Sequence, residues 1–160
     1  MEMQTQNPLF SRFDQDPGRY RPMFYNLEVT IPQGAGGWGE GSVTLRNQPF
    51  ILTAVRHQII GDTGLGNQAI DLVQDGLYSI EMRDEQSSYQ NIAGMADLMF
   101  GRAQGGDSQD LPYPIPYAGN KVLTFHVTNR IARTMFSGTY FLLGLTVAGV
   151  ADWGELALNR

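Results

Sequence analysis

One short motif, Asp62-Thr63-Gly64, contains residue types that could carry acid–base catalysis. It follows an apolar stretch that ends in Gln58-Ile-Ile-Gly61, so its carboxylate would lie at a turn directly after a strand. Two carboxylates that share one proton can act as a base and an acid, because like charges at close range cannot both ionise. The chain holds the motif once, so this chemistry would require a homodimer.

The motif is similar to the active-site signature of the aspartic proteases, and Leu142-Leu143-Gly144 matches the apolar-apolar-glycine element of that family. Leu65 departs from the pattern, because the family normally has a small residue at this position. Glycine and aspartate also supply the geometry of ordinary hairpin turns. We therefore favour a turn and keep a homodimeric aspartic protease as an alternative function.

Other residues that often carry chemistry lack the neighbours that would make a site. The run Gly34–Gly41 has no Gly-Lys-Ser/Thr, so it is not a phosphate-binding loop. We interpret it as a flexible loop with Trp38 at its tip, a candidate contact for a partner or a glycan. His57 and His126 lie in expected strands without nearby metal ligands, so both are expected to be structural. The sequence thus predicts no catalytic residue, no metal site and no cofactor.

The composition is that of a weakly charged chain. Of its 160 residues, 42% are hydrophobic and 17% are charged, against an average of about 25% charged residues. The formal net charge is −5 and no run of four basic residues occurs, which argues against direct binding to nucleic-acid phosphates. No cysteine is present, and no apolar window is long enough to span a bilayer. The N-terminus has no cationic start before an apolar core, so we expect synthesis in a cytoplasm.

Alternation of apolar and polar side chains predicts an all-β fold. The expected strands span residues 24–31, 42–46, 50–60, 77–83, 121–129 and 138–149. The third of these is apolar on both faces, which is typical of a strand buried between layers. Ile92–Phe100 is the one plausible helix, although a strand also fits. Short strands at spacings of about ten residues are typical of a β-sandwich or jelly roll, here in one domain over residues 23–160 with a short tail from Ala151.

Residues 1–22 are expected to form an extended N-terminal arm. Prolines interrupt this stretch, and its aromatic residues Phe10, Phe13 and Tyr20 fit no helix face. We predict that these aromatic side chains contact a partner. A frayed terminus is the alternative.

The segment Leu111–Asn120 contains three prolines at alternating positions, which fix an extended backbone and remove three amide donors. It therefore cannot pair as a central strand. Because alternate residues of an extended chain point to one side, Tyr113, Ile115 and Tyr117 should form one apolar row. This row either binds a neighbouring protein surface or covers a sheet edge within the same chain.

Three segments resemble a pattern in the structural proteins of tailed-bacteriophage virions. They are Asp110-Leu-Pro-Tyr-Pro-Ile-Pro-Tyr117, Leu123-Thr-Phe-His-Val-Thr-Asn129 and Thr139-Tyr-Phe-Leu-Leu-Gly-Leu145. Pro49–Ala54 resembles the first long strand of the same group, and an arm with Asp16-Pro-Gly-Arg-Tyr20 precedes it. The resemblance covers about half of the chain.

This resemblance implies a β-sandwich or jelly-roll subunit of the phage head, either a capsid decoration (cement) protein or a minor capsid protein. It implies no catalytic residues, and its expected partners are the major capsid protein or other virion proteins. Closed symmetry at local threefold axes favours a homo-oligomer, with a trimer as the expected state. A head–tail joining or tail structural protein is the alternative within this class. Neither nucleic acid nor a membrane is an expected direct partner.

Overall fold

The structure, a computed structural model, describes residues 19–32, 34–62, 78–85, 94–95, 110–111, 113–130 and 140–154. This part of the chain forms strands and contains no α-helix, which confirms the all-β prediction. The strands are β1 (Tyr20–Pro32), β2 (Trp38–Thr44), β3 (Phe50–Asp62), β4 (Tyr78–Arg83), β5 (Gly94–Met95), β6 (Ile115–Tyr117), β7 (Val122–Asn129) and β8 (Tyr140–Asp152). Within the described residues, no helix has the length and hydropathy needed to cross a membrane.

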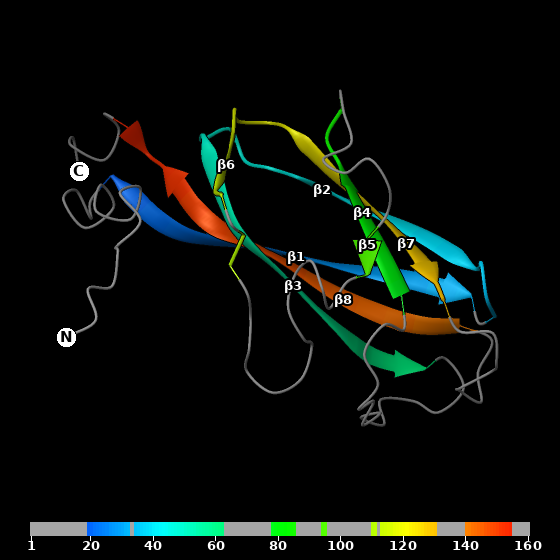
Figure 1. Cartoon of the computed structure of the whole chain (residues 1–160). Helices are drawn as coiled ribbons and strands as arrows, with labels where there is room; N and C mark the ends of the chain where they lie inside the picture. Colours follow the sequence, from blue (N-terminus) through cyan, green and yellow to red (C-terminus); the bar gives the residue numbers. More distant parts are fainter. Residues whose placement is uncertain are drawn as a thin grey trace, which may run out of the picture.

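The strands form two antiparallel sheets (Figure 1). The first sheet has the order β1-β8-β3-β6, and the second has the order β2-β7-β4-β5. The pairs β1–β8, β2–β7, β3–β6 and β4–β5 join the strands of the chain from its two ends inward. Both strands of a pair belong to the same sheet, and successive pairs belong to alternate sheets. The chain therefore changes sheets each time it passes from a strand of one pair to a strand of the next.

The edge strand β1 shows the predicted alternation, with Val29 and Ile31 buried and Glu28 and Thr30 exposed. It begins at Tyr20, however, so the last three residues of the expected arm belong to the first sheet. Pro22 is compatible with this position. The bond from Trp153 N to Arg19 O fixes the ladder pattern, in which the nitrogen of residue 22 points to the open edge rather than to β8.

A β-bulge explains why β3 reads as apolar on both faces. The register against β8 shifts between Leu52 and Ala54, so Phe50 and Leu52 point inward before the bulge and Val55 and His57 point inward after it. The apolar residues therefore change parity along the sequence while staying on one face of the sheet. Arg56 on the other face is exposed. The expectation of a strand covered on both faces is wrong at this position.

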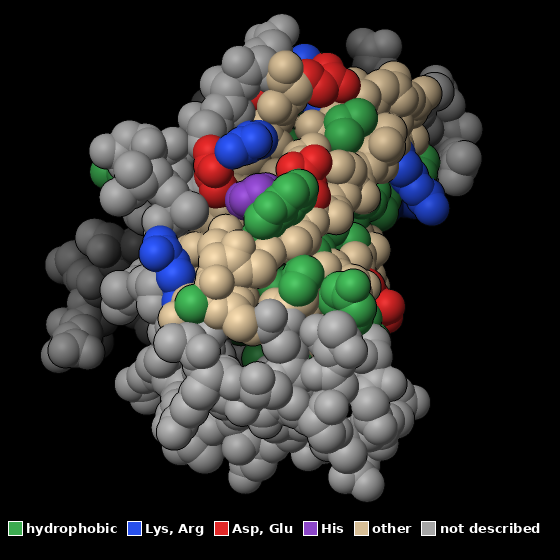
Figure 2. Space-filling view, turned by 90° about the vertical axis from the view of Figure 1, so that its right-hand side faces the viewer, with side chains coloured by type: hydrophobic (Ala, Val, Ile, Leu, Met, Phe, Trp, Pro, Cys, Tyr) green, Lys and Arg blue, Asp and Glu red, His purple; other side chains and the backbone are tan. Residues whose placement is uncertain are grey.

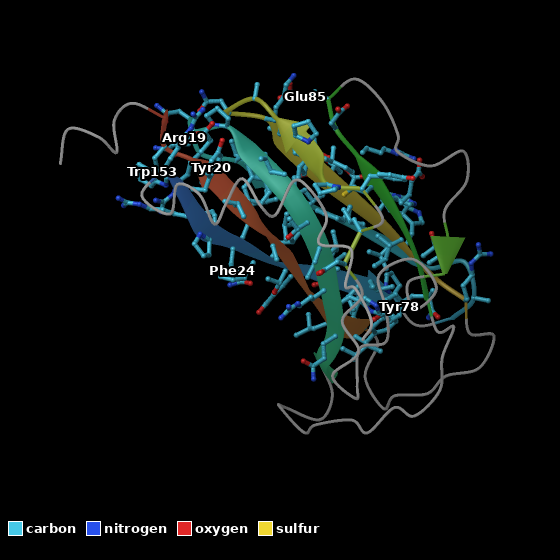
Figure 3. All side chains as sticks on the ribbon, turned by 60° about the vertical axis from the view of Figure 1, so that its left-hand side comes forward. Arg19, Tyr20, Phe24, Tyr78, Glu85 and Trp153 are labelled. Carbon is cyan, nitrogen blue, oxygen red and sulfur yellow. The ribbon has the colours of Figure 1, made fainter. Side chains whose placement is uncertain are left out.

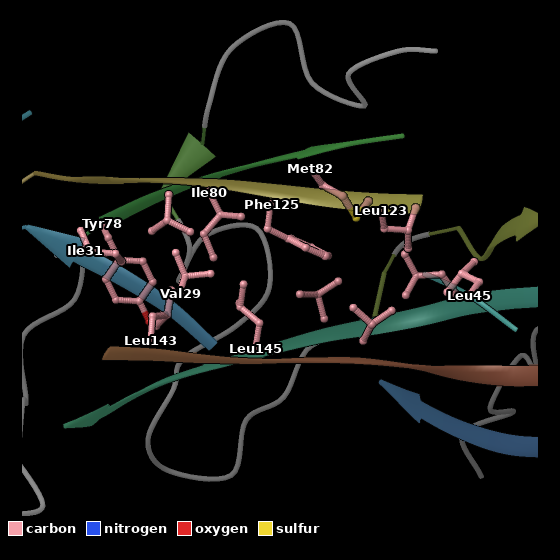
Figure 4. Close-up of a cluster of buried hydrophobic side chains, with 14 of the residues drawn as sticks. Val29, Ile31, Leu45, Tyr78, Ile80, Met82, Leu123, Phe125, Leu143 and Leu145 are labelled. Carbon is pink, nitrogen blue, oxygen red and sulfur yellow. The ribbon is translucent and has the colours of Figure 1, made fainter. Parts of the chain in front are cut away.

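The buried side chains of both sheets form one apolar cluster. Figure 4 shows Val29, Ile31, Leu143 and Leu145 of the first sheet facing side chains of the second sheet, among them Ile80, Leu123 and Phe125. The alternation predicted for β4 and β7 is confirmed, because their inward positions are buried along their whole length.

Three other boundaries differ from the sequence prediction. Trp38 begins β2 instead of lying at a loop tip, because Gly36 N donates to Asn129 O and Asn129 N donates to Gly37 O, which extends the ladder. Gly94 and Met95 of the expected helix pair with β4, so the strand alternative is confirmed for these two residues; the rest of Ile92–Phe100 lies outside the described residues. The expected tail from Ala151 still belongs to β8 as far as Asp152, which pairs with Tyr20.

One buried polar contact joins the two sheets. His57 of β3 and Tyr78 of β4 are both buried, and His57 Nδ1 hydrogen-bonds the Tyr78 hydroxyl. The two rings meet edge to face with centroids 5.4 Å apart. A buried imidazole without a partner would be costly, so this bond favours the one relative placement of the sheets that satisfies both groups. His57 is thus a structural histidine, as predicted.

Tyr78→Phe should lower the free energy of unfolding by about 1–3 kcal/mol, because it removes the hydroxyl that His57 bonds inside the core. Tyr25→Phe is the matched control: it also removes one hydroxyl, which here accepts a hydrogen bond from the exposed Arg46 amide at 3.0 Å. Urea unfolding of both variants measures the difference. Equal losses in the two variants would contradict a special role for the buried contact.

Candidate partner-binding surface

Trp38 is the most prominent aromatic side chain on the second sheet, with 58% of its surface exposed. Its backbone is held by the extended ladder and by its pairing with Thr128. One face of the indole stacks on the ring of His126, with centroids 4.9 Å apart and an interplanar angle of 27°. The indole is therefore a fixed platform on a strand, whereas the sequence predicted a mobile side chain on a loop.

A row of ionisable side chains crosses the sheet beside this indole. Glu40 of β2, His126 of β7 and Glu81 of β4 are direct cross-strand neighbours. A carboxylate oxygen of Glu40 lies 3.5 Å from His126 Nδ1, which is an ion pair whenever the imidazole is protonated. Figure 2 shows this face, with the purple imidazole beside a hydrophobic side chain and acidic groups in red around them.

Arg83 lies two residues after Glu81 on β4, opposite Thr124 in the next row of the sheet. Its Nε and Nη2 atoms donate to the two carboxylate oxygens of Glu81 at 3.0 and 2.7 Å. These hydrogen bonds and the charge of Glu81, together with the charge of Glu40, raise the pKa of Arg83 above its ordinary value. Next to it, the hydroxyls of Ser42 and Thr124 lie 3.0 Å apart and share a hydrogen bond. The surface thus offers an exposed aromatic ring, carboxylate acceptors, a fixed guanidinium and hydroxyl groups within one sheet face.

A second feature, a hollow of about 660 Å³, lies on the outer face of the first sheet. Its floor is Gly144, which has no side chain and pairs with Glu28 on one side and Gln58 on the other. Arg56 and the hydrogen-bonded pair Thr146–Asn26, 2.8 Å apart, extend its lining. The lining of the hollow includes one acidic side chain, Glu28, one basic side chain, Arg56, and the amide side chains of Asn26 and Gln58.

The proline-rich segment contributes to both surface and core. Tyr113 is 82% exposed, whereas Tyr117 is 6% exposed and belongs to the core cluster with Ile115 packed against it. Ile115–Tyr117 forms the edge strand β6, which pairs with β3 at Phe50–Leu52. Tyr117 is therefore not available as an anchor for a partner, and this corrects the expected single row. Ile115 and Tyr117 face the core because they pair with Leu52 and Phe50 of β3, whereas Tyr113 precedes the paired residues and is exposed.

The start of β1 carries the described part of the expected arm. Tyr20 is half-buried, and Phe10 and Phe13 lie outside the described residues. The guanidinium of Arg19 lies over the Tyr20 ring, and that of Arg21 lies over the Trp153 ring. Figure 3 shows Arg19, Tyr20 and Trp153 together at one end of the first sheet, with Phe24 farther along β1. Phe24 is 58% exposed on the outer face of this edge strand.

An ion pair ties this end of β1 to β8. Arg19 donates to the two carboxylate oxygens of Asp152 at 2.8 and 3.0 Å. These bonds hold the pKa of Asp152 below its ordinary value; the backbone N–H of Gly154 also lowers it, and partial burial opposes both effects.

The residues of the protease-like motif do not form a described site. Asp62 is the last residue of β3 and pairs with Phe141, while Thr63 and Gly64 lie outside the described residues. Leu142 and Gly144 of the apolar-apolar-glycine element belong to the neighbouring strand β8. Among the described residues, no group of three or more histidine and acidic side chains could hold a metal ion.

No family model matches the chain, and no curated protein matches its sequence.

Sequence reasoning found Trp38 and His126 separately but did not bring them together. One signal was available, because Trp38 and Glu40 are two residues apart and must share a face if they lie in a strand. The pairing of that strand with the one that contains His126 comes from the register, which short patterns do not encode.

Tyr117→Ala should lower the free energy of unfolding by about 3–5 kcal/mol, the cost of truncating a large buried aromatic side chain. Tyr113→Ala, two positions before β6, should change it by less than about 0.5 kcal/mol, since exposed side chains contribute little. Chemical denaturation of the two variants measures this contrast. Comparable losses would show that Tyr113 also packs in the folded chain.

The lowered pKa of Asp152 gives a pH dependence with a defined sign. A carboxyl group whose folded-state pKa is depressed adds stability above its unfolded pKa of about 3.9, and this stability is lost as the pH falls through the folded-state value. Asp152→Asn should therefore cost about 0.2–1 kcal/mol at neutral pH and nothing at pH values below the folded-state pKa. Glu28→Gln on the same sheet is the control. A penalty for Asp152→Asn that persists in strong acid would contradict the ion-pair explanation.

Proposed function

We propose that this chain is a non-enzymatic structural protein of a tailed-bacteriophage virion, a capsid decoration (cement) protein or a minor capsid protein of the phage head. The sequence resemblance of the segments around Tyr117, His126 and Leu143 supports this proposal, and so does the order in which the strands pair. Two of these segments form inner strands that contribute side chains to the core: β8 in the first sheet and β7 in the second.

The pairing order is the observation that carries the proposal. We infer that the two facing sheets are a β-sandwich of the jelly-roll type, because β1–β8, β2–β7, β3–β6 and β4–β5 pair as one long hairpin would if it were wrapped around a core. Jelly rolls recur in viral capsid domains, and also in lectin domains and cupins. The step from this fold to a capsid role is an analogy between folds, because one fold supports many functions.

The distribution of exposed aromatic side chains agrees with a subunit that has several neighbours. Phe24 on β1, Trp38 on β2 and Tyr113 before β6 are large, mostly exposed, and belong to three different segments of the described surface. Aromatic residues are enriched where proteins contact one another. We propose that the partners are the major capsid protein or other virion proteins and a second and third copy of this chain. The residues before β1 would act as an extended arm that lies across a neighbour.

The proposal predicts that the chain is present in purified heads of the phage whose genome encodes it, and that the isolated chain forms a homo-oligomer, with a trimer as the expected mass by light scattering. Heads that lack the chain should bind it again and then withstand higher temperature. Removal of residues 1–18 should weaken this binding and leave the domain folded, because β1 starts at Tyr20.

Three outcomes would redirect the proposal. Detection of the chain in isolated tails would support the head–tail joining or tail alternative. Its absence from purified particles would overturn the virion role. Asp62→Ala should leave attachment to heads intact. Proteolytic activity that this substitution abolishes would support the homodimeric aspartic protease instead.

A further inference from the structure

The outer face of the second sheet carries a mostly exposed indole beside ionisable side chains. One face of the indole is covered by the His126 ring, 58% of Trp38 is exposed, and acidic groups lie around the imidazole (Figure 2). We propose that this face binds a neutral pyranose ring of a glycan, with Trp38 as the stacking platform. The proposal goes beyond the virion role and does not depend on it, because all the residues that carry it belong to one chain.

The indole is already in position before any ligand arrives. Its backbone lies in the β2–β7 ladder, and His126 supports one side of the ring at a centroid distance of 4.9 Å. A pyranose has a flat face of C–H groups, and stacking this face on the indole removes apolar surface of both from water. Little side-chain freedom is lost on binding, because the imidazole behind the indole already restrains it.

The polar groups around the indole match the hydroxyl groups at the rim of a sugar. A hydroxyl both donates and accepts hydrogen bonds, so a sugar site needs acceptors and donors side by side. The carboxylate of Glu40, with 45% of its side chain exposed, is an acceptor two residues from Trp38 on the same face of β2. Arg83 lies farther along the same face, opposite Thr124, and is a donor for a more distant part of the glycan; two bonds to Glu81 fix its orientation. Hydrogen bonds to such ionised groups are stronger than those between neutral groups.

The balance of charge favours a neutral ligand over an ion. Two carboxylates, those of Glu40 and Glu81, lie beside the imidazole, and two guanidinium groups lie at the same face: Arg83, paired with Glu81, and Arg130, whose Nε lies 3.2 Å from Ser79 Oγ. A cationic side chain would meet the two arginines, and an anion would meet the two carboxylates. A neutral polyhydroxylated ring avoids both repulsions and can still use each charged group as a hydrogen-bond partner.

Titration of the ¹⁵N-labelled chain with methyl glycosides of glucose, galactose, mannose and N-acetylglucosamine tests the proposal. At least one probe should shift the indole N–H signal of Trp38 in a saturable manner, and the signal of Trp153 serves as the internal control at the far end of the first sheet. Glu40→Gln should weaken that binding about tenfold, as expected for the loss of a hydrogen bond to a charged group. Glu28→Gln, the same change on the first sheet, should leave it unaltered.

The spectrum of each variant also shows whether it is folded, so loss of binding cannot be confused with loss of structure. Absence of a Trp38 shift with every glycoside, equal shifts of Trp38 and Trp153, or unchanged affinity in Glu40→Gln would each overturn the proposal. A shift produced by N-acetyl-arginine amide and by none of the sugars would overturn it as well and identify a site for cationic side chains. None of these outcomes depends on a phage particle, so they are independent of the virion role.

Discussion

The arrangement of this protein depends on the burial of apolar side chains between two sheets. Each sheet carries an apolar inner face, and in the described residues each face is covered by the other sheet. Burial of this kind contributes about 25 cal/mol for each Å² of apolar surface removed from water. It also fixes the register, because a slip by one residue would turn every inward side chain of a strand toward solvent.

Close approach of the strands follows from the same constraint. An added Cβ at Gly39 of β2 would lie 2.2 Å from the carbonyl oxygen of Thr30 in β1, so only glycine allows the edges of the two sheets to come this near. One residue before and one residue after Gly39 on β2, at Trp38 and Glu40, the side chains point outward. Gly39 thus allows β2 to pack closely against β1. Its two neighbours, Trp38 and Glu40, present the indole and the carboxylate of the proposed sugar site to solvent.

Local patterns predicted the fold class and several strands, because alternation reports directly which side chains are buried. They failed where a single residue changes parity or pairing. The bulge after Leu52 made β3 look apolar on both faces, and the ladder bonds of Gly36 and Gly37 brought Trp38 into a strand. Tyr113 and Tyr117 would lie on the same side of an extended chain, yet of these two only Tyr117, which pairs with β3, is buried in the core.

The candidate surface was less predictable than the fold, since its members come from three strands. Trp38 and Glu40 share a strand, but His126 and Glu81 join them only through the registers of β7 with β2 and of β4 with β7. Such registers are set by the whole core rather than by the residues of the surface. In the proposed virion role, the same rigid frame would carry the exposed aromatic side chains toward several neighbours at once.

One core unites both sheets, so they should unfold together. Native-state hydrogen exchange of the isolated chain tests this most directly, because it measures the free energy at which each amide becomes exposed to solvent. A shared core predicts that the slowest amides of β7, in the second sheet, and of β8, in the first, exchange with the same free energy, equal to that of global unfolding. Amides of β7 that exchange at a clearly lower free energy than those of β8 would contradict it.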